Sequence, residues 1–163
     1  MSLIEQIKAK AFKIGYFYVY KSWEDTHLQF EKEYDKRLGG KTLGPVLYFL
    51  FVDGELTKIG KTVNLGVRLS TYRQGRSRGE ATNTLIMDTM KYDDKTKDDV
   101  IEMYGIKVPH VDLKYKCPLT GNELNESVDM ITNLERRYTH LYLAESGGKR
   151  LSMISQIPKK YRN

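Results

Sequence analysis

The strongest apolar pattern in the chain is the run Val46–Val52, seven apolar residues in succession, which is typical of a strand buried on both faces. The dipeptide Asp53-Gly54 follows it and is a strong signal for a two-residue hairpin, because both central positions of such a turn need positive φ. The pattern therefore predicts a partner strand over Leu56–Ile59. A helix is predicted next over Asn64–Arg73, with Thr62 or Asn64 available to cap its first turn.

Further elements are predicted toward the C-terminus. A helix over Thr84–Tyr92 precedes a strand over Val100–Val111, and a hairpin over Tyr115–Leu124 turns near Thr120-Gly121-Asn122. A long helix is expected over Ser127–Ser146, ended by two glycines.

The N-terminal part reads mainly as helix from about Ser2 to Arg37, although the aromatic cluster Tyr16–Tyr20 could instead be a short strand. Glycine and proline mark Leu38–Pro45 as a linker. We therefore predict a helical extension over residues 1–43, a main unit over 44–146 and a basic tail over 147–163. The extension could hold a dimer interface or further nucleic-acid contacts.

Charge narrows the class of partner. The net charge of +6 and the pI near 9.2 favour an anionic partner, either nucleic acid or an anionic membrane surface. Six basic residues and no acidic one lie between Thr57 and Gly79: Lys58, Lys61, Arg68, Arg73, Arg76 and Arg78. A basic stretch is often only a solvated surface, but the missing acids here favour phosphate contact.

Other classes of protein are disfavoured. Hydrophobic residues make up 40% of the chain, as in soluble globular proteins, and no apolar run approaches the roughly 20 residues that span a bilayer. Cys117 is the only cysteine, so an intrachain disulfide and a thiolate zinc cluster are both excluded. We expect a cytoplasmic protein without membrane association.

Glu135 lies among the apolar positions of the long predicted helix, which recur at three- and four-residue spacing: Val128, Ile131, Leu134, Tyr138, Leu141 and Tyr142. A carboxylate on this face loses free energy on desolvation unless it has a partner. Two interpretations follow. Glu135 either reaches out to an arginine such as Arg136, or it ligates a metal such as Mg²⁺ together with water and phosphate.

The helix over Asn64–Arg73 offers a similar case. Arg68 precedes Tyr72 by four residues, so the two side chains project side by side on the face marked by Leu65 and Leu69. An arginine stem packed over the core and a core aromatic would each be an ordinary structural choice. Together with Glu135 they favour the lining of a charged pocket.

These residues, at these spacings, resemble the GIY-YIG nuclease family. Leu47-Tyr48-Phe49 stands at the GIY element, and Lys58-Ile59-Gly60 stands at YIG ten residues later. The stretch Asn64–Tyr72 then matches the pattern N-L-x-x-R-L-x-x-Y, and Glu135 matches the family's metal-binding glutamate. The resemblance covers roughly Val46–Leu143.

The departures from the family pattern are informative. The glycine and isoleucine of GIY are absent, and Lys58 replaces the first tyrosine of YIG. That lysine resembles one branch of small GIY-YIG type II restriction endonucleases, which also have an N-terminal extension and a hairpin inserted before the glutamate helix. The resemblance implies an α+β fold: a small antiparallel sheet of about three strands flanked by helices, with a helical N-terminal extension and an inserted β-hairpin.

The resemblance also implies a role for each residue of the motif. Tyr48 would be the general base, Lys58 would favour its phenolate, Arg68 would bind the scissile phosphate, and Tyr72 would contact the phosphate or hold Tyr48. Glu135 would hold one Mg²⁺ or Mn²⁺ ion per active site. Further contacts to DNA are expected from Lys61, Arg73, Arg76 and Arg78.

The implied activity is metal-dependent hydrolysis of double-stranded DNA, most simply by a homodimeric restriction enzyme in a prokaryotic or phage-infected cell, with a cognate DNA methyltransferase. Two alternatives remain: a phage or mobile-element endonuclease of looser specificity, and a non-catalytic DNA-binding module.

Overall fold

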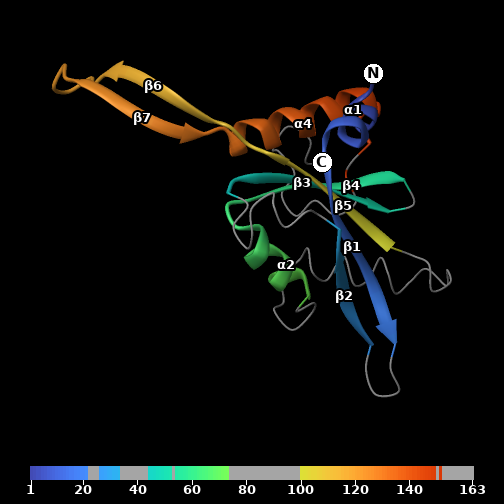
Figure 1. Cartoon of the computed structure of the whole chain (residues 1–163). Coiled ribbons are helices and arrows are strands. Elements are labelled where there is room, and N and C mark those ends of the chain that lie inside the picture. Colours follow the sequence, from blue (N-terminus) through green and yellow to red (C-terminus); the bar gives the residue numbers. More distant parts are fainter. Residues whose placement is uncertain (22–25, 34–43, 53, 74–99, 150, 152–163) are drawn as a thin grey trace.

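The structure, a computed structural model, describes residues 1–21, 26–33, 44–52, 54–73, 100–149 and 151. Antiparallel strands build a central sheet, helices lie on both of its faces, and a separate hairpin extends away from it (Figure 1). The elements are, in order, α1 (Leu3–Lys10), β1 (Phe12–Lys21), β2 (Thr26–Lys32), β3 (Val46–Val52), β4 (Glu55–Thr62), α2 (Leu65–Arg73), β5 (Val100–Lys107), β6 (His110–Lys116), β7 (Glu123–Asp129) and α4 (Ile131–Glu145).

The central sheet has five strands in the order β2-β1-β5-β3-β4, all neighbours antiparallel, so β4 is an edge strand of the described sheet. The α+β class is thereby confirmed. The sheet exceeds the three or so strands expected from sequence because the N-terminal residues add β1 and β2. Among the described residues before β3, helix is limited to α1, and the prediction of helix is wrong over Phe12–Lys21 and Thr26–Lys32, which are strands. The alternative of a strand through Tyr16–Tyr20 is confirmed.

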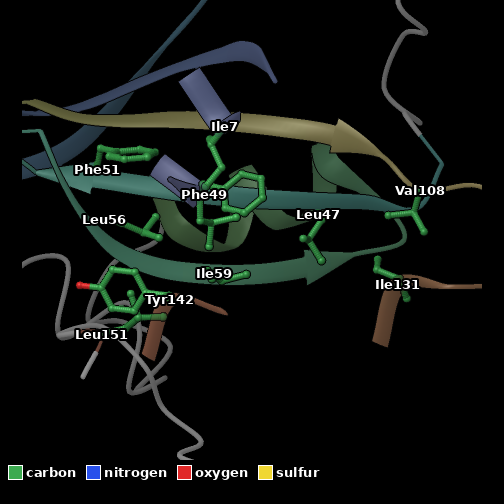
Figure 2. Close-up of a cluster of buried hydrophobic side chains, with 11 residues drawn as sticks. Ile7, Leu47, Phe49, Phe51, Leu56, Ile59, Val108, Ile131, Tyr142 and Leu151 are labelled. Carbon is green, nitrogen blue, oxygen red and sulfur yellow. The ribbon is translucent and has the colours of Figure 1, made fainter. Parts of the chain in front are cut away.

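Strand β3 is buried on both faces, as its unbroken apolar run predicts. Its even-numbered residues Tyr48 and Leu50 pack with α2 and β1 in one cluster. The odd-numbered Leu47, Phe49 and Phe51 face the other side, where α1 and α4 cover the sheet and contribute Ile7, Ile131 and Tyr142 (Figure 2). The alternation of a strand thus supplies two cores from a single apolar segment.

A β-bulge in the β3–β4 hairpin decides which side chains of β4 share a face with Tyr48. Leu56 lies opposite Phe51, but Lys58 rather than Thr57 lies opposite Leu50, so Thr57 is the extra residue. The hydroxyl of Thr57 donates to the carbonyl oxygen of Leu50 at 3.0 Å. Beyond the bulge Lys58 and Gly60 lie on the Tyr48 face, whereas Lys61 lies on the opposite face with Leu47.

The strand predicted over Val100–Val111 is in fact two strands. Strand β5 ends at Lys107, and the chain enters β6 after Pro109, which lacks the N–H needed to continue a ladder. Strands β6 and β7 form their own two-stranded sheet, and Gly121 takes a left-handed φ of 72° in the turn between them. The predicted hairpin is therefore confirmed but longer than expected.

Helix α4 begins at Ile131, not at Ser127, because residues up to Asp129 belong to β7. Val128 is consequently a strand residue rather than part of the helical stripe. The predicted stop is confirmed: Gly147 and Gly148 have φ of 67° and 89°. The N–H of Gly148 donates to the carbonyl oxygen of Leu143 at 2.7 Å, as in a Schellman motif. The predicted helix over Thr84–Tyr92 and most of the predicted linker lie outside the described residues.

Candidate active site

Tyr48 and Tyr72 form the buried part of the candidate site. Tyr48 lies on β3 with 1% of its surface exposed, and Tyr72 lies on α2 with 0% exposed. Their hydroxyl groups share a hydrogen bond, and their rings meet edge to face with centroids 6.0 Å apart. A contact with Tyr48 is one of the two roles expected for Tyr72, and this hydrogen bond makes that contact.

Lys58 is a buried cation on the same side of the hairpin. Only 8% of its surface is exposed. Burial, followed by the nearby charge of Arg68, lowers the pKa of Lys58 to about 8, although the carboxylate of Glu135 acts in the opposite direction. Lys58 thus lies within electrostatic range of two predicted site residues that come from different helices.

Arg68 is placed by the first turns of α2. The side-chain oxygen of Asn64 accepts a hydrogen bond from the backbone N–H of Val67 at 3.1 Å, so Asn64 is the N-cap, one of the two caps expected. From this anchored start, Arg68 projects beside Tyr72, with the guanidinium carbon 5.8 Å from the ring centroid. The side-by-side arrangement predicted for Arg68 and Tyr72 is confirmed.

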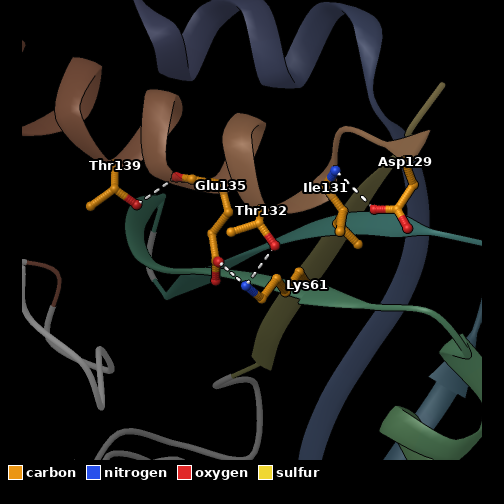
Figure 3. Close-up of polar contacts among 6 residues, drawn as sticks. All are labelled: Lys61, Asp129, Ile131, Thr132, Glu135 and Thr139. Carbon is orange, nitrogen blue, oxygen red and sulfur yellow. Dashed lines mark hydrogen bonds and ion pairs between the residues drawn. The ribbon is translucent and has the colours of Figure 1, made fainter. Parts of the chain in front are cut away.

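Glu135 lies on α4, on the opposite side of the sheet. One of its carboxylate oxygens, Oε2, is 3.0 Å from the Nζ atom of Lys61, which also donates to the hydroxyl of Thr132 at 3.2 Å (Figure 3). The Glu135 side chain is 29% exposed and that of Lys61 is 40% exposed. Glu135 therefore lies at the rim of the α4 core face, within reach of solvent.

The two groups of residues approach each other around the edge strand β4. Lys58 faces α2 and Lys61 faces α4, because they lie three positions apart on β4 beyond the bulge. At the end of this strand, an open groove of about 560 Å³ separates α2 from the start of α4. Its lining includes two cations and no acidic residue: Lys61, Thr62, Val63, Asn64, Val67, Arg68, Thr71, Ile131 and Thr132. Such a groove suits an anion such as a phosphate.

Two residues acquire roles that the sequence pattern did not assign. Gly60 lies directly opposite Tyr48, and a Cβ atom at Gly60 would meet the Tyr48 ring closer than 3.0 Å. Thr132 holds the Nζ atom of Lys61. With the bulge at Thr57 known, the register of the hairpin would have predicted that Gly60 lies opposite Tyr48. No signal in the sequence marks Thr132.

The structure describes two of the four residues that were expected to make further contacts to DNA. Lys61 lines the groove, but it is bound to Glu135 rather than standing alone as a phosphate contact. Arg73 is the last residue of α2. Arg76 and Arg78 lie outside the described residues.

The site fits a metal ion held by one carboxylate. Within the described ranges, no three His, Cys, Asp or Glu side chains come together as a ligand set. The Glu135 side chain is 29% exposed, and one of its carboxylate oxygens is paired with the Lys61 ammonium. Mg²⁺ commonly keeps several waters and takes one or two carboxylates plus phosphate oxygens, so Glu135 is the residue that could hold such an ion.

The fold is similar to solved structures of two proteins. The structure of a glutamate-to-alanine mutant of bacteriophage T4 EndoII aligns with a TM-score of 0.57 and 18% identity, covering 85% of this chain and 92% of that one. Restriction endonuclease HPY188I in complex with product DNA aligns with a TM-score of 0.48 and 16% identity, covering 94% and 84%. No family model and no curated protein matches the sequence.

In the part of the chain that the structure describes, no helix has the length and apolar character needed to cross a membrane.

Proposed function

We propose that this protein is a metal-dependent endonuclease that hydrolyses phosphodiester bonds of double-stranded DNA. The observation that carries the proposal is the arrangement of five polar residues around the edge strand β4, four on the side of α2 and one on the side of α4, next to a groove that Arg68 and Lys61 line. Two of them are the buried, hydrogen-bonded tyrosines, two are the cations Lys58 and Arg68, and the fifth is the carboxylate of Glu135. The fold adds support, since the phage protein to which it is similar is named as an endonuclease.

Each side chain takes a distinct task in the proposed reaction. Arg68 binds the scissile phosphate from the groove wall and stabilises the charge that develops on it. Tyr48 accepts the proton of the attacking water, and Tyr72 holds the Tyr48 hydroxyl in place. The cation of Lys58 favours the phenolate form of Tyr48, because opposite charges in a low-dielectric interior attract strongly.

Glu135 would hold the metal ion, with waters and phosphate oxygens as its other ligands. When bound, the ion supplies positive charge that stabilises the leaving 3′-oxygen. Glu135 suits this task because its carboxylate is partly exposed.

Among endonucleases we favour a type II restriction enzyme, because Lys58 stands where one branch of those enzymes also has a lysine. Cutting both strands of a palindromic site needs two active sites, which a two-fold symmetric homodimer supplies. A methyltransferase of the same specificity would then protect the host DNA. An endonuclease of looser specificity and a non-catalytic DNA-binding module remain the alternatives.

The test incubates the purified protein with plasmid DNA and Mg²⁺ and then sequences the ends. Discrete fragments with a common end sequence support a restriction enzyme, and scattered nicks support a looser nuclease. DNA retardation in a gel without any cleavage would overturn the endonuclease proposal in favour of the binding module.

The metal assignment is tested by Glu135→Gln, which should lower the cleavage rate roughly 100- to 1,000-fold, as expected for loss of a group that stabilises transition-state charge. DNA binding should persist. Glu55→Gln is the matched control, because Glu55 also pairs with a lysine, Lys149, at 3.2 Å but lies on an exposed part of the hairpin. Full cleavage by the Glu135→Gln protein would refute the assignment.

A further inference from the structure

The ion pair between Lys61 and Glu135 occupies the position that the proposed metal needs. The ammonium group lies 3.0 Å from Oε2 of the carboxylate and is held a second time by the hydroxyl of Thr132 at 3.2 Å. Both partners of the pair are partly exposed, with 40% and 29% of their side-chain surfaces accessible. Water and ions can therefore reach the pair without any rearrangement of the core.

We propose that Lys61 is the resident counter-ion of Glu135, occupying the carboxylate until a divalent ion displaces it. The proposal rests on the proposed function and deepens it, because it assigns Lys61 a part in controlling metal affinity. A divalent ion and an ammonium group on the same carboxylate would repel each other at close range. Metal binding and the Lys61–Glu135 pair therefore compete for the same carboxylate, and weakening the pair is part of the cost of binding metal.

The groove also offers a second anion-binding position for the Lys61 ammonium. Its side chain lines the groove that Arg68 lines from the other side, and this groove suits a phosphate group. A lysine carries its charge on a flexible four-carbon stem, so its ammonium can turn from Glu135 to a phosphate oxygen without movement of β4. Lys61 would then exchange one anion for another when metal and DNA enter together. This exchange would couple the two binding events.

A purely structural role explains the pair less well. Exposed lysine–carboxylate pairs contribute little to stability, and α4 is already held on the sheet by the buried Ile131 and Tyr142. The pair of Lys149 and Glu55 provides an internal comparison. It has the same chemistry and a similar separation of 3.2 Å, but it lies away from the groove.

The test measures Mn²⁺ binding to the full chain without DNA, by electron paramagnetic resonance of the free ion. Lys61→Met removes the ammonium and keeps an apolar stem of similar length. We expect the dissociation constant for Mn²⁺ to fall roughly two- to fivefold, the factor that corresponds to losing a partly exposed ion pair. Lys149→Met is the matched control. It removes one positive charge from another lysine–glutamate pair and should leave Mn²⁺ affinity unchanged.

Equal or weaker Mn²⁺ binding by the Lys61→Met protein would overturn the proposal, as would an equal gain in the Lys149→Met protein. A thermal melt in EDTA shows whether the variants are folded, and Lys61→Arg supplies a second variant that keeps the charge and should bind Mn²⁺ no more tightly than the natural chain. Failure of this inference and failure of the proposed function give different results. If the natural protein cuts DNA but Lys61→Met binds Mn²⁺ as before, only this inference fails. Absence of cleavage by the natural protein would instead count against the nuclease.

Discussion

Lys58 should lower the stability of this protein at neutral pH, and its replacement by methionine should raise it. The side chain is 8% exposed, and its pKa lies near 8 rather than 10.5 because burial disfavours the charged form. The folded state therefore binds the lysine proton less tightly than the unfolded chain does. Protonated Lys58 opposes folding below pH 8, and this opposition disappears as the pH rises through 10.5.

The size of the effect follows from the two pKa values of Lys58, about 8 in the folded state and 10.5 as the reference, at 1.36 kcal/mol per pH unit. Linkage gives a destabilisation of about 3 kcal/mol at pH 7, about 2 kcal/mol at pH 9 and less than about 0.5 kcal/mol at pH 10.5. Methionine matches the lysine stem and carries no charge. The free energy of unfolding of Lys58→Met should thus exceed that of the natural chain by the most at pH 7, and the gap should close toward pH 10.5.

The assay is urea unfolding of both proteins between pH 7 and pH 10.5. The difference between the two proteins is the measured quantity, because other tyrosines and lysines titrate in both and cancel. Lys149→Met serves as control, since Lys149 is exposed and its replacement should produce no such trend. A gap that stays constant across this range would refute the reasoning. The stabilised Lys58→Met protein should at the same time cut DNA more slowly, as expected where an active site holds a charge against a desolvation cost.

Three further predictions concern the groups that position the site. Gly60→Ala should displace the Tyr48 ring, because a Cβ atom at position 60 would overlap it. We expect a lower cleavage rate in a plasmid assay and, in urea unfolding, a loss of stability of about 1–3 kcal/mol, as for other overpacked cores. Full activity would contradict the proposed placement of Tyr48. Tyr72→Phe removes one hydrogen bond of the buried Tyr48 hydroxyl and should cost about 0.5–1.5 kcal/mol in the same unfolding assay. An unchanged midpoint would show that this hydrogen bond contributes nothing to stability. Asn64→Ala removes the hydrogen bond from the N–H of Val67 and should cost about 1 kcal/mol of stability, measured in a thermal melt. Asn64→Asp can still cap α2 and should keep the melting temperature of the natural chain. Equal losses in the two variants would argue against the cap.

Much of the hairpin and of α2 was predictable because the signals there are local. A continuous apolar run, a turn dipeptide and a capping residue each act within a few positions of the chain, and β3, β4 and α2 follow them. The N-terminal part was predicted less well. Its many charges and spaced apolar residues favour a helix, but the segment from Phe12 pairs with β5, nearly ninety positions away, and that pairing decides its structure.

The sequence by itself determined which chemical groups this protein can use: tyrosine hydroxyls, lysine and arginine cations and one carboxylate on a later helix, at spacings that resemble a nuclease family. The tertiary structure alone decided how they meet. A regular two-residue hairpin would place Tyr48 opposite Ile59, leaving Lys58 on the other face, and only the bulge at Thr57 puts Lys58 on the face that carries Tyr48. The pairing of Lys61 with Glu135 likewise depends on α4 packing beside β4, a contact between segments more than seventy positions apart. Strand register and long-range packing are properties of the whole fold, so no local pattern could supply them.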